Sequence, residues 1–198
     1  MQSILDDRKA MIPFDTVTIP TKRLTLRFLT DSDTHALFEI FSHPEVMRFW
    51  SSPPLTDLTQ VQQMLAGFYD DYGTRNALHL GIERQADHVL IGVCTFYHFH
   101  FESRRAELGY ALGRPFWRSG YMHEALQAFI GYAFETLDLN RLEADIDPRN
   151  HASAKTLERL GFQKEGLLRE RWIVSGEVSD TCLYGLLHRN WLERPPAA

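Results

Sequence analysis

The chain has 198 residues, 44% of them hydrophobic and 24% charged, and its formal net charge at pH 7 is −5. This composition is typical of one globular domain, and it excludes fibrous and intrinsically disordered chains. The acidic balance argues against a nucleic-acid partner, whose phosphates need a basic surface, and mildly favours a cationic partner.

The cysteines, the apolar stretches and the N-terminus bear on the compartment. Cys94 and Cys182 fit neither a disulfide framework nor a CxxC metal or redox motif. The longest apolar stretch, Val89 to Phe101, contains two histidines and is too short to cross a bilayer. Asp6 and Asp7 stand where a secretory signal needs a basic start and an apolar run. These features predict a cytoplasmic protein with no membrane partner.

The first half of the chain predicts a strand, two helices and three more strands. Residues 23–28 alternate polar and apolar side chains, and Thr30 to Asp33 offer N-caps for a helix that Pro44 ends. A second helix is expected from about Asp57 to Tyr72. The strands that follow, joined by short hairpin connections, are expected at Ala77–Glu83, Val89–Phe101 and Ala106–Leu112.

The second half contains the clearest helix, because apolar residues recur at i, i+3, i+4 and i+7 from Met122 to Leu137. A strand at 141–146 and a helix capped by Asn150 follow, and Gly161-Phe162 closes that helix in a Schellman motif. Two final strands, near 167–175 and 177–187, meet at Ser175-Gly176. This order of elements predicts a mixed α/β (α+β) sheet with helices on its faces.

The segment from Glu107 to Met122 runs from a strand through a loop into the long helix. Arg114 and Arg118 lie in the loop, and Gly120 precedes a helix start whose free N–H groups and dipole favour anions. The segment matches neither a Walker loop nor a dinucleotide-binding fingerprint. These residues alone fit a phosphate site and a plain strand-to-helix turn equally well.

The same segment resembles the acetyl-CoA pyrophosphate loop of the GNAT N-acetyltransferases, and within them the ribosomal-protein N-terminal acetyltransferases RimJ and RimL. The general pattern of that loop is met only at Gly120, since Trp117 and Met122 replace its ends. The matches together cover roughly Thr21 to Trp191. They comprise Trp117 to Ala125, Glu107-Leu108-Gly109-Tyr110, Thr21 to Arg27, Asn150, Ser153 and Leu160-Gly161-Phe162.

The resemblance implies the GNAT fold: a mixed, mostly antiparallel sheet of about six to seven strands, splayed between the fourth and fifth and flanked by helices on both faces. The splay is expected between the strand ending near Gly113 and the strand from Arg141, because the pantetheine arm of acetyl-CoA needs unpaired backbone to bond. The expected organisation is an N-terminal extension at 1–20, the acetyltransferase domain at 21–191 and a tail at 192–198, in a monomer or a homodimer.

Acetyl-CoA, used as a co-substrate without a metal, is the implied cofactor. Backbone from Gly109 to Ala111 would polarise the thioester carbonyl. Asn150 is similar to the family residue that contacts the cofactor, but it also caps its helix, and both roles are open. The implied cofactor-binding residues are Gly109, Tyr110, Ala111, Leu112, Trp117, Arg118, Ser119, Gly120, Tyr121, Met122 and Asn150.

Acetyl transfer to an amine needs a base for the ammonium, a polarised carbonyl and a proton for the leaving thiolate. The resemblance implies Glu107 as the base, and the alternative is an exposed glutamate paired with Arg104 or Arg105. The position of the acidic tyrosine of many GNAT enzymes holds Leu157 here. The resemblance therefore suggests Ser153 as the acid, although a capping role explains this residue equally well.

His98 and His100 are expected on one face of a strand, as a substrate-facing or surface pair or, with a third ligand that the sequence does not offer, as metal ligands. Tyr97, Phe99 and Phe101 are expected on the opposite, core face.

Phe49, Trp50 and Ser51 to Pro54 either border the acceptor groove or form a plain loop. The predicted function is transfer of an acetyl group from acetyl-CoA to a primary amine, in the first place a protein or peptide N-terminus. The alternatives are acetylation of a small amine, such as a polyamine or aminoglycoside, and a non-catalytic acyl-CoA-binding regulatory module.

Overall fold

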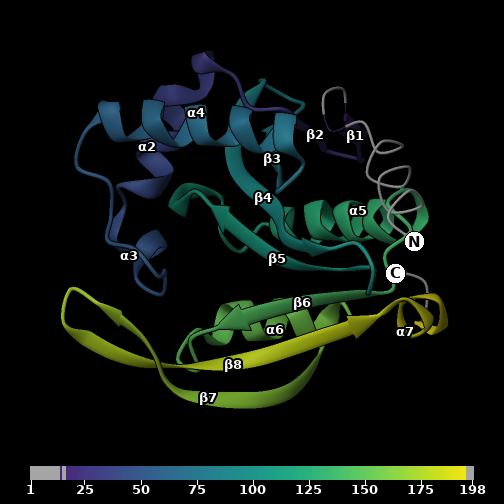
Figure 1. The fold of residues 1–198 in the computed structure, drawn as a ribbon. Coiled ribbons are helices and arrows are strands. Elements are labelled where there is room, and N and C mark those ends of the chain that lie inside the picture. Colours follow the sequence, from purple (N-terminus) through teal and green to yellow (C-terminus); the bar gives the residue numbers. More distant parts are fainter. Residues whose placement is uncertain (1–13, 15–16, 195–198) are drawn as a thin grey trace.

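The computed structural model describes residue 14 and residues 17–194; residues 1–13 and 15–16 of the predicted extension and 195–198 of the predicted tail lie outside the described residues. The described chain forms one sheet with helices on both faces (Figure 1). The strands are β1 (Ile19–Pro20), β2 (Leu24–Arg27), β3 (Leu78–Arg84), β4 (Val89–His100), β5 (Arg105–Leu112), β6 (Arg141–Ile146), β7 (Gln163–Val174) and β8 (Glu177–Leu187). The helices are η1 (Asp31–Asp33), α2 (Thr34–Phe41), α3 (Pro44–Met47), α4 (Leu58–Thr74), η2 (Arg114–Phe116), α5 (Tyr121–Glu135), α6 (His151–Arg159) and α7 (His188–Glu193).

The eight strands of the described chain lie in the order β1-β2-β3-β4-β5-β6-β8-β7. Neighbouring strands are antiparallel except β5 and β6, which are parallel. The predicted mixed, mostly antiparallel sheet is therefore confirmed. It has one strand more than expected, because the two-residue β1 pairs with β2 and is too short to leave a sequence pattern.

The sheet opens between β5 and β6, where the splay was predicted. Only three residues of each strand pair, Arg105–Glu107 with Arg141–Glu143. Beyond Glu107, the rest of β5 up to Leu112 has no strand partner on that edge. Figure 1 shows the two strands diverging from this point. The opening leaves backbone N–H and C=O groups of β5 available to a ligand.

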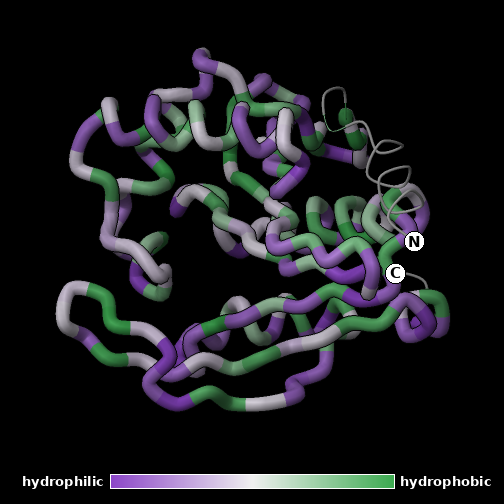
Figure 2. Tube along the Cα trace, in the orientation of Figure 1, coloured by the Kyte–Doolittle hydropathy of each residue, from purple (hydrophilic) through white to green (hydrophobic). Residues whose placement is uncertain are grey.

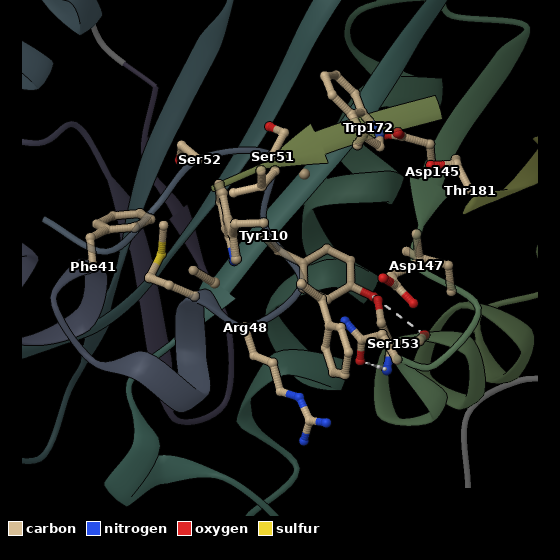
Figure 3. A pocket seen from close by; sticks show the side chains of 18 of the residues that line it. Phe41, Arg48, Ser51, Ser52, Tyr110, Asp145, Asp147, Ser153, Trp172 and Thr181 are labelled. Atoms are coloured by element: carbon tan, nitrogen blue, oxygen red, sulfur yellow. Dashed lines mark hydrogen bonds between the residues drawn. The ribbon is translucent and has the colours of Figure 1, made fainter. Parts of the chain in front are cut away.

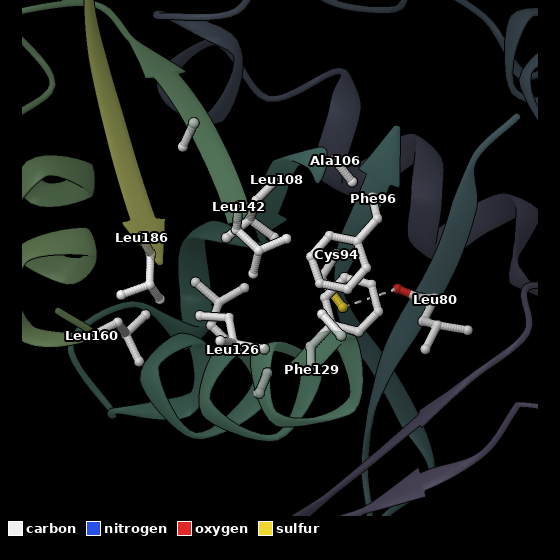
Figure 4. Close-up of a cluster of buried hydrophobic side chains, with 14 of the residues drawn as sticks. Leu80, Cys94, Phe96, Ala106, Leu108, Leu126, Phe129, Leu142, Leu160 and Leu186 are labelled. Carbon is white, nitrogen blue, oxygen red and sulfur yellow. Dashed lines mark hydrogen bonds between the residues drawn. The ribbon is translucent and has the colours of Figure 1, made fainter. Parts of the chain in front are cut away.

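Helix α5 holds the two halves of the open sheet together. Its apolar stripe buries Leu126 and Phe129, and Phe129 stacks on Phe96 of β4 with ring centroids 3.8 Å apart (Figure 4). Leu142 of β6 and Leu186 of β8 belong to the same buried cluster. Burial of each large apolar side chain contributes about 1.5–3 kcal/mol. This shared core stabilises the arrangement in which β5 and β6 separate.

Helices α2 and α4 cover the opposite face of the sheet. They form a second buried cluster with β4 and β5, which includes Leu37, Ile40, Leu65, Val93 and Ala111. Figure 2 shows polar and apolar residues mixed along both helices, as expected for helices that bury one side. Within residues 17–194, no helix is both long enough and apolar enough to span a membrane.

The helix ends confirm most of the predicted signals. Gly161 has φ +94°, and the N–H groups of Gly161 and Phe162 bond the carbonyls of Glu158 and Leu157 at 3.0 Å, as a Schellman motif requires. The expectation that Pro44 ends the first helix was wrong. Helix α2 ends at Phe41, and Pro44 begins α3, because the first helical position does not need the N–H that proline lacks.

Candidate active site

A cavity of about 720 Å³ lies at the opening of the sheet (Figure 3). Its walls come from α3 and the loop after it, from β4, β5 and β6, from the start of α6 and from the β7–β8 hairpin. The predicted residues in its lining are Glu107, Gly109, Tyr110, Ala111, Asn150 and Ser153. Phe49, Trp50 and Ser51 to Pro54 also line it, which agrees with a groove rather than a plain loop. Leu112 and the Trp117–Met122 segment are not part of this lining.

Glu107 lies at the fork of the splay, because it is the last residue of β5 that pairs with β6. Its side chain is 27% exposed, and its Oε1 lies 3.1 Å from Nδ1 of His98 on β4. The two arginines expected as alternative partners bond elsewhere, Arg104 to Asp138 and Arg105 to Glu143. The carboxylate therefore faces the cavity with only an exposed histidine as its ionic partner among the described residues.

A β-bulge positions His98. Tyr97 pairs with Glu107 and His100 pairs with Arg105, so β4 has one extra residue here, and His98 adopts φ +49°. The predicted common core face for Tyr97, Phe99 and Phe101 was therefore wrong, because the extra residue interrupts the alternation. Tyr97 lines the cavity, whereas Phe99 packs against the core.

The same bulge separates the roles of the two histidines. His98 contacts the Glu107 carboxylate, whereas Nδ1 of His100 accepts the N–H of Ser103 in the following turn. In residues 17–194, no group of three or more histidine, cysteine, aspartate or glutamate side chains is placed to hold a metal ion.

Ser153 lies in the first turn of α6 and is 9% exposed. Its N–H donates to Oδ1 of Asn150 at 3.1 Å, so the capping role of Asn150 is confirmed. The Ser153 hydroxyl takes no part in this cap. It lies 2.6 Å from the phenol of Tyr110, which comes from β5 across the opening (Figure 3).

The sequence did not predict a hydroxyl pair at this place. Tyr110 was expected to bind the cofactor. The position on α6 at which the family resemblance would place an acidic tyrosine holds Leu157, which is fully buried. Burial raises the pKa of Tyr110 to about 12, so the phenol stays protonated at neutral pH. Since Tyr110 and Ser153 are 43 residues apart, only the tertiary structure brings them together.

Several charged groups of the cavity were not singled out from the sequence. Asp147, after β6, accepts bonds from Arg149, and this guanidinium lowers the pKa of the carboxyl group. Arg149 also bonds Glu177 of the β7–β8 hairpin, which fastens the hairpin to the end of β6. Asp145 lines the cavity near Tyr97, whose pKa is raised by burial and by this carboxylate. Asp145 and Trp172 of the hairpin both line the cavity (Figure 3).

A buried histidine forms part of the cavity wall next to β4. His79 on β3 contacts Thr95 Oγ1 at 3.0 Å through Nδ1 and Asp71 Oδ2 at 2.9 Å through Nε2. Burial lowers the pKa of His79, so its neutral form is favoured. No local sequence pattern marks this residue, because its partners lie on α4 and β4.

The loop before α5 leaves open space beside the N-terminus of that helix. Gly120 has φ +76°, and a Cβ there would have only an Arg23 nitrogen within 4 Å, at 3.5 Å. Arg118 forms no ion pair with a described residue, and the Met122 side chain packs against the core. The free N–H groups of the first turn of α5 lie next to this loop.

Two contacts hold this loop in place. The Trp117 indole donates to the Leu112 carbonyl at 2.7 Å, which ties the loop to the end of β5. Arg23 bonds both Glu124 of α5 and the Ser119 carbonyl. The loop is thus connected to β5 and β2 as well as to its helix.

Comparison with known proteins identifies the class. A family model described as an acetyltransferase (GNAT) domain matches residues 23–163. The chain is 40% identical to the uncharacterized N-acetyltransferase p20 of Bacillus licheniformis, over 88% of this chain and 98% of that protein. It is 29% identical to the ribosomal protein uS5-alanine N-acetyltransferase of Escherichia coli, over 88% of this chain and 93% of that enzyme.

Solved structures agree on the fold. RimJ of Mycobacterium smegmatis, in complex with CoA-disulfide, superposes with a TM-score of 0.81 at 24% identity, over 93% of each chain. Spermidine N-acetyltransferase of Vibrio cholerae, in complex with CoA and spermine, superposes with a TM-score of 0.77 at 19% identity, over 86% of this chain and 99% of that one. At these identities the structures establish the fold alone.

The protein is an acyltransferase enzyme rather than a non-catalytic acyl-CoA-binding module. It belongs to the GNAT acetyltransferase family, and its relatives include ribosomal-protein N-acetyltransferases, as the resemblance to RimJ and RimL predicted.

Proposed function

We propose that this enzyme transfers the acetyl group of acetyl-CoA to the N-terminal amine of a protein or peptide. The observation that carries the proposal is the cavity at the open edge of β5, which brings Glu107 from one strand and Ser153 from a distant helix to one site. The 29% identity to an enzyme named ribosomal protein uS5-alanine N-acetyltransferase supports a protein amine as the acceptor.

Acetyl-CoA would supply the acetyl group as a thioester, and two features of the chain fit it. The edge of β5 from Gly109 to Leu112 has no strand partner and can bond the pantetheine amides. The space at Gly120, the free first-turn N–H groups of α5 and Arg118, which has no ion pair within the described part of the chain, fit a pyrophosphate. The predicted segment Trp117 to Met122 therefore binds the phosphates in this proposal.

Glu107 is the proposed base. An ammonium in the cavity would lose a proton to this carboxylate, directly or through water, and the neutral amine would attack the thioester carbon. A backbone N–H of the free β5 edge would stabilise the negative charge on the carbonyl oxygen. The Ser153 hydroxyl would then protonate the thiolate as the carbon–sulfur bond breaks.

A small cationic amine is the second candidate acceptor. Asp145 and Glu107 both line the cavity, and neither forms an ion pair with an arginine of the described residues, which favours a ligand with more than one positive charge. Arg48 and Arg171 line the same cavity and form no ion pair among the described residues, although the charge of Arg48 acts on Asp147; the two guanidinium groups favour an acceptor that also carries a negative group. A peptide can provide both charges, whereas a polyamine cannot.

The test is an acetylation assay with a panel of acceptors. Purified protein and acetyl-CoA are incubated with peptides that have free N-termini, with polyamines and with aminoglycosides, and release of the CoA thiol is followed. The proposal predicts the highest kcat/KM for one of the peptides, and no reaction when its N-terminus is blocked. A polyamine with a higher kcat/KM than every peptide would support the second candidate instead.

A further inference from the structure

The hydroxyl groups of Tyr110 and Ser153 form an isolated pair at the cavity wall. Their oxygens are 2.6 Å apart, and the only other bond of the phenol among the described residues is to the Ser153 carbonyl oxygen at 3.4 Å. Both residues line the cavity. The Ser153 N–H is already used in the cap with Asn150, so the hydroxyl is held in place without being consumed.

The pair has two possible arrangements of its protons. In one, the phenol donates to Ser153 Oγ, and the single serine proton is free to point at a ligand in the cavity. In the other, Ser153 donates to the phenol oxygen, and the phenol proton turns to the Ser153 carbonyl oxygen. The first arrangement uses the shorter contact of the phenol and leaves a donor facing the site.

Acid strength favours the Tyr110 phenol as the source of the proton that Ser153 donates. An aliphatic hydroxyl is about as weak an acid as water, far weaker than a thiol, whose pKa is about 8.5. Transfer of a proton from an isolated serine hydroxyl to a thiolate is therefore unfavourable. Burial raises the pKa of Tyr110 to about 12, which still leaves the phenol a stronger acid than the serine hydroxyl.

We propose that Tyr110 supplies, through Ser153, the proton that the leaving thiolate takes, an inference that rests on the proposed acetyl transfer. As the carbon–sulfur bond breaks, its electron pair stays on sulfur, which takes the proton of Ser153 Oγ. The serine oxygen simultaneously takes the phenol proton, and Tyr110 becomes a tyrosinate. The attacking nitrogen loses two protons overall: one restores the phenol through solvent, and the other is released.

The test compares Tyr110→Phe, Ser153→Ala and the double variant. We expect each single variant to lower kcat about tenfold or more while KM for acetyl-CoA stays within about twofold. The double variant should be no more than about threefold slower than Ser153→Ala, because both groups serve one proton transfer. Tyr69→Phe is the matched control, since it removes a phenol on α4 that bonds Asp31 and is not part of the cavity lining. Its kcat should stay within about twofold of the parent.

A second measurement tests the role of Tyr110 if Tyr110→Phe fails to fold. Replacement of Tyr110 by 3-fluorotyrosine keeps the shape of the side chain and makes the phenol more acidic. Ser153 and the Tyr184 phenol are the neighbouring groups that act on its titration. We expect the alkaline limb of the kcat profile to move to lower pH, because a tyrosinate cannot donate, and a merely structural tyrosine would leave the limb in place.

The outcomes separate this inference from the proposed function. A slow Ser153→Ala with a fully active Tyr110→Phe would overturn the inference and leave Ser153 as the acid. A fully active Ser153→Ala would overturn the acid of the proposed mechanism itself. Multiplicative losses in the double variant, or an alkaline limb that fluorination does not move, would show that Tyr110 only packs against its neighbour.

Discussion

Glu107→Gln tests the base. The change keeps the shape of the side chain and removes the charge at the fork of β5 and β6. General-base catalysis contributes about 10²–10⁴ in rate, so kcat should fall by that factor near pH 7. The fold should hardly change, because the bond to His98, whose side chain is 71% exposed, is worth only about 0.2–1 kcal/mol.

The pH dependence of kcat/KM for Glu107→Gln follows from the titration of the substrate amine. An α-amino group has a pKa of about 8, so its neutral fraction rises from about a tenth at pH 7 to about nine tenths at pH 9. A variant without a base depends on this fraction, and its kcat/KM for a peptide should rise roughly tenfold over the same range. The parent enzyme, which deprotonates its own substrate, should change much less.

The assay is thiol release from acetyl-CoA with a fixed peptide, measured from pH 6.5 to 9. Glu143→Gln is the matched control, because Glu143 is the β6 residue opposite Glu107 in the β5–β6 pairing, bonds Arg105 and Arg141, and is not part of the cavity lining. A Glu107→Gln variant that keeps full activity at pH 7 would refute this reasoning. Catalysis would then rest on holding an already neutral amine in place.

Three other predictions use different parts of the chain. CoA at 100 times its Kd should stabilise the protein by about 2.7 kcal/mol, a rise of roughly 5–11 °C in Tm, and Gly120→Val should abolish this rise by filling the phosphate site; an unchanged rise would place the site elsewhere. His98→Asn should lower kcat about threefold or more, because Glu107 loses the group that orients it. His88→Asn, which removes a similar histidine–glutamate bond at a residue with φ +58° outside the cavity lining, should leave kcat unchanged, and equal effects would contradict the role of His98. Because burial lowers the pKa of His79 in the folded state, the unfolded chain binds more protons below about pH 6.5, and the free energy of unfolding should fall as the pH drops through that region. His79→Gln should flatten this dependence in urea titrations at pH 7 and pH 5, and an unaltered slope would show that other groups cause it.

The local patterns of the sequence predicted what depends on local physics. The period of the apolar residues located α5, and Gly161 with Phe162 located the end of α6, because both signals act within a few residues. The opening between β5 and β6 followed from the family resemblance rather than from any pattern. Strand pairing joins residues far apart in the chain, and alternation alone does not report where pairing stops.

The details of the site depended on tertiary contacts. The extra residue at His98 inverts the alternation of β4, and a single histidine in a left-handed conformation leaves no mark in the sequence. The Tyr110 phenol reaches Ser153 only because α6 packs beside the open edge of β5. Arg149 bonds Glu177 only because the β7–β8 hairpin folds back to the end of β6. Each of these contacts joins segments that are far apart in the sequence. Hydrophobic periodicity and short motifs are local signals, and they do not predict such contacts.

Mass spectrometry of an acceptor peptide shows whether this enzyme acetylates a peptide N-terminus with Glu107 and Ser153 as base and acid. A peptide with a free N-terminus is incubated with acetyl-CoA and the parent enzyme, the Glu107→Gln variant or the Ser153→Ala variant, and the modified atom is located by fragmentation. We expect one added acetyl group on the N-terminal nitrogen with the parent enzyme, and product formation slower by at least tenfold with each variant. Acetylation of lysine side chains alone, or equal rates for all three proteins, would contradict it.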